Sequence, residues 1–437
     1  MMTRAYYLPI KILWLISFLL SAIFLSGCAS ISKGVTAAIL EKSESVDTRL
    51  CQVWGQPFAG IEPGLAKKQG KTKILMVHGV GDHIPGFTTQ FLGKLAKELD
   101  LNVRSGVPKN ITITTPLFPD MNLGNLRIVR LLNEENGKEV IFYELTWSDI
   151  TREDKKLLAF DSSGEYDFRR ATMNSMLKKF SNDTGPDPLI YLGKSREPIQ
   201  AAFSQSFCWM VKHNWENIPK SGKHPCLGLN DATDTDVYNM INDDYIFISH
   251  SLGSRITIDG MQRIAGMLPN QEKIRSLENV KIGVSEKVIQ ALRSKRIPIF
   301  MLSNQLPMLQ LGRELPEVTG QIAQYCAPEG PNYNERMVSE TSIIAFSDPN
   351  DLLSYGIPPG FSEKYLDSRL CPRITNVNIN VAKTIDAFGI SGLANPMYAH
   401  VGYDTDDRIV ALIAKGIGTP NTSPLIKQRC EFTKTVE

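Results

Sequence analysis

The chain has 437 residues, of which 42% are hydrophobic and 22% charged, the balance of a globular protein that can bury a sizeable core. Its 48 basic and 46 acidic residues give a formal net charge of +2, without the basic stripe that nucleic-acid binding usually needs, so a nucleic-acid partner is not expected. The length allows two or three average domains, or one large α/β domain with an insertion.

The first residues have the layout of an export signal. Arg4 and Lys11 flank the start of an apolar run at residues 12–25, and the small residues Ser26 and Gly27 follow it. The tetrapeptide Leu-Ser-Gly-Cys that ends at Cys28 resembles the lipobox of bacterial lipoproteins. The alternative is an uncleaved transmembrane anchor, since the run is nearly long enough to span a bilayer.

The lipobox resemblance implies that residues 1–27 are a signal peptide and that Cys28 is acylated, which tethers the chain to a membrane. Either alternative exports the chain from Ala29 onward. An aspartate after the cysteine would favour the inner membrane. Because Ala29 stands there, the expected location is the cell envelope, at the periplasmic face of the outer membrane.

The remaining cysteines are even in number, which suits an oxidising compartment. Three disulfides are possible, with 15 pairings that the sequence does not distinguish, and buried free thiols are the alternative. These cysteines are Cys51, Cys208, Cys226, Cys326, Cys371 and Cys430.

Beyond a tether and lead-in at residues 28–70, the chain predicts one domain at residues 71–437. Apolar runs predict strands at 73–77, 140–147, 245–248, 297–302, 342–346 and 374–381. Helical spacing predicts helices at 87–99, 254–268 and 408–417. This alternation predicts an α/β fold with a mostly parallel sheet covered by helices on both faces.

Residues 149–240 interrupt this rhythm and are expected to form a helical, cap-like insertion. It includes a helix at 169–180 and a loop at 220–228. An apolar stripe at helical spacing predicts either a lid that opens on lipid or a helix packed on the core. The stripe consists of Ile199, Phe203, Phe207, Met210 and Val211.

The central motif is Ser-His-Ser-Leu-Gly at residues 249–253, between an apolar strand and a helix. A strand that turns at once into a helix exposes the apex side chain of Ser251 at the helix N-terminus, where backbone N–H groups favour developing negative charge. The motif resembles Gly-x-Ser-x-Gly, the nucleophile elbow of the α/β-hydrolase family, with Ser249 in place of the first glycine. The alternative role for Ser251 is a helix N-cap.

The resemblance covers about residues 71–418 and implies the chain order nucleophile, acid, base. Of six histidines only His400 lies downstream of Ser251, in a loop before the last helix, so it is the candidate base. The candidate acid is Asp351, whose position before an apolar pair fits the family spacing, and Asp348 is the runner-up. His250, beside the nucleophile, is expected to be structural.

Two backbone N–H groups are the candidate oxyanion donors. One belongs to Leu252, directly after the nucleophile. The other belongs to Val80, in the His-Gly-Val-Gly segment at residues 78–81. That segment lacks the lysine and third glycine of phosphate-binding loops, and the cysteines form no Cys-x-x-Cys pair, so neither a cofactor nor a metal is expected.

The resemblance implies a lipase- or esterase-like serine hydrolase that cleaves carboxylic ester or lipid acyl bonds through an acyl-enzyme, with an ester or lipid as substrate. Thioesters and peptides are possible substrates for the same triad. The alternative from another class is a non-catalytic envelope lipoprotein that uses the fold as a binding scaffold. Acyl-chain preference and oligomeric state leave no signal in the sequence.

Overall fold

The computed structural model of the chain divides into two compact units, residues 1–48 with 167–179 and residues 49–166 with 180–437. The structure describes residues 51–103, 107–160, 171–227, 229, 232–267, 284–387 and 390–433. The predicted signal peptide, Cys28 and the start of the tether lie outside these residues. Of the first unit only residues 171–179 are described, and residues 172–179 belong to α6 (Thr172–Thr184). All other elements below belong to the second unit.

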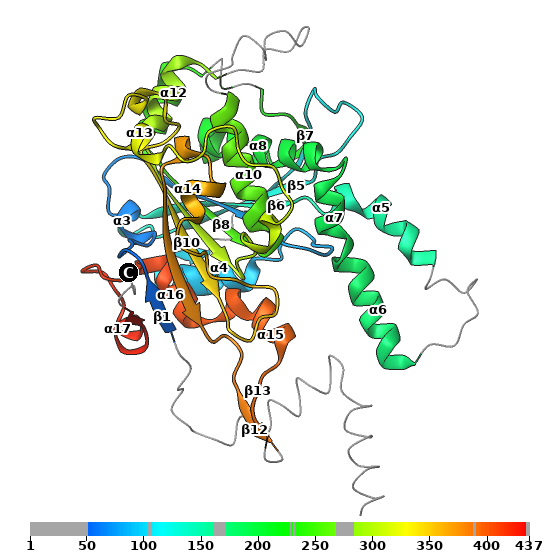
Figure 1. Cartoon of the computed structure of the whole chain (residues 1–437). Helices are drawn as coiled ribbons and strands as arrows, with labels where there is room; N and C mark the ends of the chain where they lie inside the picture. The colour runs from blue at the N-terminus through cyan, green and yellow to red at the C-terminus, as the bar shows by residue number, and fades with distance from the viewer. Residues whose placement is uncertain are drawn as a thin grey trace, which may run out of the picture. The chain divides into compact units, whose positions relative to one another are not determined.

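A twelve-stranded mixed sheet organises the second unit (Figure 1). Its order is β14-β1-β11-β10-β9-β8-β2-β6-β5-β4-β7, and β3 pairs with β5. The six strands from β11 to β6 are all parallel, whereas β1, β5 and β4 add antiparallel pairings toward the edges. The fold is therefore α/β with a mostly parallel centre, as predicted.

The strands and helices have the following bounds. The strands are β1 (Cys51–Trp54), β2 (Thr72–Val77), β3 (Asn102–Val103), β4 (Lys109–Ile113), β5 (Asn125–Leu132), β6 (Glu139–Thr146), β7 (Ser221–His224), β8 (Asp244–His250), β9 (Arg296–Leu302), β10 (Glu340–Ser347), β11 (Pro372–Ile379) and β14 (Glu431–Phe432), with a separate hairpin of β12 (Ile385–Ala387) and β13 (Ile390–Leu393). The helices are α3 (Glu62–Leu65), α4 (Thr89–Glu98), α5 (Asp149–Ala159), α7 (Pro186–Leu192), α8 (Arg196–Lys212), α9 (Asp234–Asn242), α10 (Leu252–Met267), α12 (Glu286–Arg293), α13 (Ile322–Cys326), α14 (Phe361–Tyr365), α15 (Pro396–Val401), α16 (Asp407–Lys415) and α17 (Pro424–Arg429).

Two hydrophobic cores lie on opposite faces of the sheet, because successive strand side chains point to opposite sides. On β2, Leu75 and Val77 join the core that contains α8 and α10, whereas Ile74 and Met76 join the core that contains α4 and α16. Both faces are thus covered by helices, which is why the central strands consist of continuous apolar residues.

The apolar stripe of the insertion lies in α8 and is buried. Its members are at most 1% exposed and belong to the core formed with α10. Of the two interpretations, the packed core helix is therefore the one that the structure contains. The insertion also contributes β7, which extends the sheet beside β4.

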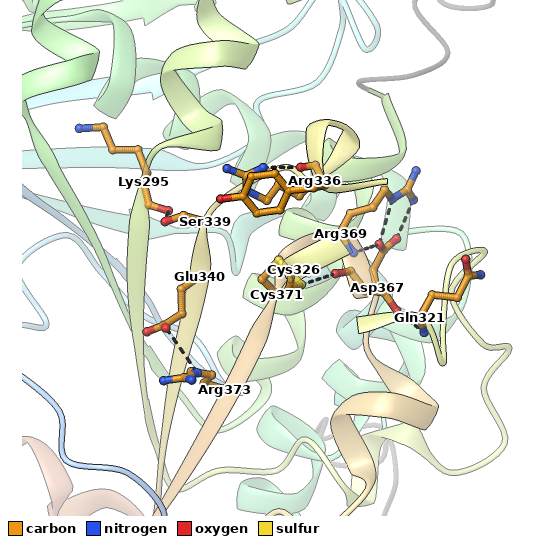
Figure 2. Close-up of a disulfide and its surroundings, with 12 residues drawn as sticks. Lys295, Gln321, Cys326, Arg336, Ser339, Glu340, Asp367, Arg369, Cys371 and Arg373 are labelled. Carbon is orange, nitrogen blue, oxygen red and sulfur yellow. Dashed lines mark hydrogen bonds and ion pairs between the residues drawn. A yellow bond between two sulfur atoms is a disulfide. The ribbon is translucent and has the colours of Figure 1, made fainter. Parts of the chain in front are cut away.

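Three disulfides join all six cysteines of the described chain. Cys51 pairs with Cys430, Cys208 with Cys226, and Cys326 with Cys371. The first joins β1 to the residue directly before β14, the strand that pairs with β1 at one edge of the sheet. Figure 2 shows the third, with the buried pair of Arg369 and Asp367 nearby.

No helix within the described part of the chain is both long and apolar enough to cross a membrane. The apolar run at residues 12–25 lies outside that part.

Candidate active site

Ser251 lies at the apex of the turn between β8 and α10. Its φ is +55°, a left-handed conformation that is uncommon for a residue with a side chain. Its backbone N–H donates to the Leu302 carbonyl at the end of β9 (2.9 Å), and its carbonyl accepts from the Ser254 N–H (3.0 Å). Its Oγ has no hydrogen-bond partner, so Ser251 does not act as an N-cap of α10.

Gly253 allows this turn to form. A Cβ atom at this position would lie 2.4 Å from the carbonyl oxygen of Val77 and 2.7 Å from that of His78, closer than real contacts allow. The first turn of α10 therefore packs directly on the end of β2. The substituted position, Ser249, is fully buried, and its Oγ lies 3.5 Å from the Ser254 Oγ.

His400 lies in α15, a short helix that the side chain of Asn395 caps. Its Nδ1 lies 3.0 Å from Asp351 Oδ1. The two residues come from segments that follow β10 and the β12–β13 hairpin, and the fold brings them together. Burial by itself would raise the pKa of Asp351, but the hydrogen bond and charge of His400, with further hydrogen bonds, hold that pKa below its usual value.

The carboxylate of Asp348 binds backbone N–H groups and has a structural role. Its Oδ2 accepts the backbone N–H groups of Val381 (2.7 Å) and Ala382 (2.9 Å), and its Oδ1 accepts that of Asn350 (2.7 Å). The carboxylate therefore joins the turn after β10 to the segment after β11. Asp351, and not Asp348, is the carboxylate in contact with His400.

Two further residues, which no sequence motif indicated, contact Asp351 through their hydroxyl groups. Ser303, directly after β9, has its Oγ 2.7 Å from Asp351 Oδ2 and 2.9 Å from His400 Nδ1. The Tyr403 hydroxyl donates to Asp351 Oδ2 (3.2 Å) and accepts the backbone N–H of Asp348 (2.7 Å). The position of Ser303 at the carboxyl end of a central strand was the only available signal for its involvement.

His250 directly precedes Ser251 and contacts His400 of α15. Its ring lies 5.3 Å from the ring of His400, and its Nε2 lies 2.8 Å from the His400 carbonyl oxygen, to which it donates. Burial, with the neighbouring His400, lowers the pKa of His250 to about 3, so the ring is neutral and keeps a fixed donor.

The loop after β2 lies against Ser251, the candidate nucleophile. A Cβ at Gly79 would be 2.7 Å from the Cβ of Ser251, so this loop, which carries Val80, approaches the elbow at backbone distance. The ring of His78 stacks on Trp147, whose backbone N–H donates to His78 Nε2 (3.1 Å). Burial lowers the pKa of His78 well below its ordinary value, which keeps this acceptor nitrogen unprotonated.

The insertion also holds this loop. The buried Asp187 of α7 accepts the backbone N–H of Gly81 (2.6 Å) and forms an ion pair with Lys155 of α5 (3.1 Å). The residue after Val80 is therefore fixed by a carboxylate from a segment about a hundred residues further along the chain. Asp187 carried no signal in the sequence, since one aspartate in a helix usually faces solvent.

The site is closed in this conformation. Ser251 is 0% exposed and His400 8% exposed, and both Ser251 Oγ and His400 Nε2 are buried without a hydrogen-bond partner. An unsatisfied buried polar atom costs about 1–3 kcal/mol, so the two unpaired atoms at this site require an explanation.

Within the described residues, no group of three or more histidine, cysteine, aspartate or glutamate side chains could hold a metal ion. Comparison of the chain with protein-family models, with curated proteins and with solved structures finds no match.

Proposed function

We propose that this chain is a serine hydrolase of the α/β-hydrolase type that cleaves carboxylic ester or lipid acyl bonds, with Ser251 as nucleophile, His400 as base and Asp351 as acid. The observation that carries the proposal is the set of groups that follow the carboxyl ends of the central strands β8 and β10. A strained serine with an unpaired Oγ lies in the same buried site as a histidine with a free Nε2, whose Nδ1 contacts a carboxylate.

The proposed reaction follows from these atoms. Ser251 Oγ attacks the acyl carbon while His400 Nε2 accepts the hydroxyl proton, and that proton then passes to the departing alcohol. Water, deprotonated by the same Nε2, releases the acid from the acyl-enzyme. Asp351 keeps the proton of the neutral imidazole on Nδ1 and stabilises the imidazolium that forms.

The backbone N–H groups of Leu252 and Val80 are the proposed oxyanion donors. Leu252 is the first residue of α10, where N–H groups have no partner within the helix. Val80 lies in the loop whose backbone approaches Ser251. Each donor would contribute about 10²- to 10³-fold in rate.

Because the Ser251 hydroxyl is covered, the proposal requires the chain around it to move before a substrate enters. Gating by loops is common in hydrolytic enzymes and sets many turnover rates. A small, reactive probe is therefore the best first test.

The direct test is covalent labelling with a fluorophosphonate. Wild type should be labelled at one site, and Ser251→Ala should not. Ser249→Ala is the matched control, because this neighbouring serine is buried in the same turn but lies before the apex. An unlabelled wild type, or a labelled Ser251→Ala, would leave the non-catalytic scaffold as the better interpretation. A panel of soluble acyl esters of increasing chain length would then define the substrate.

We also propose that the chain is anchored in the cell envelope through an acylated Cys28, at the periplasmic face of the outer membrane, after removal of residues 1–27 as a signal peptide. Metabolic labelling with a palmitate analogue tests this independently of activity. Wild type should incorporate the label and Cys28→Ala should not. An unlabelled wild type that stays in the membrane would instead support the uncleaved anchor.

A further inference from the structure

The residues at the carboxyl end of β9 contact both halves of the candidate site. The Leu302 carbonyl accepts the backbone N–H of Ser251 (2.9 Å). The next residue, Ser303, lies with its Oγ 2.9 Å from His400 Nδ1. Two consecutive residues of one strand end therefore hold the nucleophile through its backbone and the histidine through its ring.

We infer that Ser303 is a positioning residue, which holds the proton of His400 on Nδ1 and so directs the basic Nε2 toward Ser251. This inference rests on the proposed function. It assigns a role to a side chain that touches neither the substrate nor the reacting atoms.

The hydrogen-bond geometry permits one consistent arrangement of protons. Asp351 Oδ2 only accepts, so the Ser303 hydroxyl donates its proton to it across 2.7 Å. The lone pairs of Ser303 Oγ then face His400 Nδ1, which also lies 3.0 Å from Asp351 Oδ1. Two acceptors point at Nδ1, so this nitrogen carries the hydrogen, and Nε2 is left with its lone pair.

The opposite tautomer is disfavoured by the same contacts. An unprotonated Nδ1 would place its lone pair 3.0 Å from a carboxylate oxygen. The Ser303 proton would also have to leave the ionised Asp351 for a neutral nitrogen, which gives up a charge-assisted hydrogen bond. Ser303 thus adds to the effect of Asp351 and also stabilises that carboxylate.

The backbone of Ser303 supports a specific role for this side chain. Its φ is +49°, a region where glycine is the usual residue, and the side chain is fully buried. The following N–H, of Asn304, donates to the Phe346 carbonyl of β10 (2.9 Å), which fixes this turn beside the strand that leads to Asp351. A non-glycine residue persists in such a conformation where the surroundings require it.

The test uses Ser303→Gly and Ser303→Ala in the full-length chain. Glycine suits the left-handed backbone and so preserves folding, whereas alanine removes only the hydroxyl. Both should lower kcat on a soluble ester by about tenfold with little change in KM, the size expected from one hydrogen bond to an ionised network. The matched control is Ser206→Ala, which removes another fully buried hydroxyl, bonded to the Ala202 carbonyl within α8 (2.8 Å), and should leave kcat unchanged.

A second readout separates positioning from general stability and needs no catalysis. Nitrogen NMR of ¹⁵N-histidine-labelled protein reports the tautomer, with His400→Gln used to assign the signal. Wild type should show His400 protonated at Nδ1, and both Ser303 variants should show faster exchange of that proton with solvent. Wild-type exchange and kcat in both variants would overturn the inference. A wild type without esterase activity whose Nδ1 proton still depends on Ser303 would refute the proposed function and the catalytic part of this inference, and would leave only the effect of Ser303 on the His400 tautomer.

Discussion

The Nε2 of His250 donates to the backbone carbonyl of His400 across 2.8 Å, which joins the turn that contains Ser251 directly to α15, the helix that carries the candidate base. His250, beside the candidate nucleophile Ser251, therefore contributes to the position of His400 through the main chain. Because the pKa of His250 is lowered to about 3, this donor has the same protonation state throughout the neutral range.

The neutral state of the half-buried His250 predicts a pH dependence of stability. The unfolded chain titrates at this position near pH 6.5, whereas the folded chain does so near 3, so stability is fully present above the unfolded pKa and falls as the pH drops below it. Between pH 7 and 5 this group alone should cost about 2 kcal/mol. His250→Gln, which retains an N–H donor but does not titrate, should lose correspondingly less. Urea unfolding at both pH values measures this, and equal losses in the two proteins would contradict the assignment.

Substitution of Asp351 should lower activity, whereas substitution of Asp348 should lower stability. Asp351→Asn should lower kcat by about 10⁴-fold, because an amide can stabilise the wrong histidine tautomer. Asp348→Asn can turn an amide N–H₂ group toward the N–H groups of Val381 and Ala382, and should lower the free energy of unfolding by about 2 kcal/mol. Ester kinetics and denaturant unfolding of both variants check this. A larger loss of activity in correctly folded Asp348→Asn would reverse the assignment of the acid.

Two glycine substitutions should have opposite effects on stability, because one glycine packs against β2 and the other faces open space. Gly253→Ala would place a Cβ 2.4 Å from the Val77 carbonyl oxygen and should destabilise the fold severely. Gly93 lies exposed within α4 with no atom within 4 Å of an added Cβ, so Gly93→Ala should stabilise the protein by about 0.5–1 kcal/mol. Thermal unfolding of both variants measures the difference, and a normally stable Gly253→Ala would mean that the turn is looser than described.

The disulfides should differ in their contributions to stability. Cys51 and Cys430 are 379 residues apart, whereas Cys208 and Cys226 are 18 apart. Because a cross-link restricts the unfolded chain more when it closes a longer loop, the pair Cys51→Ala with Cys430→Ala should cost about 4 kcal/mol or more, and the pair Cys208→Ala with Cys226→Ala about 3 kcal/mol. Unfolding of the two double variants tests this order. The reverse order would show that local strain or residual structure outweighs chain entropy.

The central strands could be predicted from sequence because parallel strands covered on both faces are continuous apolar runs. The strands toward the two edges of the sheet, β1, β3, β4, β5, β7 and β14, escaped prediction. β7 consists of Ser-Gly-Lys-His and is exposed or half-buried, so no apolar pattern marks it, and its pairing with β4 depends on a fold in which distant segments meet.

The α/β class, the location of the serine turn and the single candidate base could all be predicted from the sequence, because each depends on local pattern or chain order. The aspartate that contacts His400, the cysteine pairs, and the contacts of Ser303, Tyr403 and Asp187 around the site became known from the folded arrangement of the chain. These contacts of about 3 Å join residues that are tens or hundreds of positions apart. A single polar side chain has no periodic pattern from which its partner could be predicted.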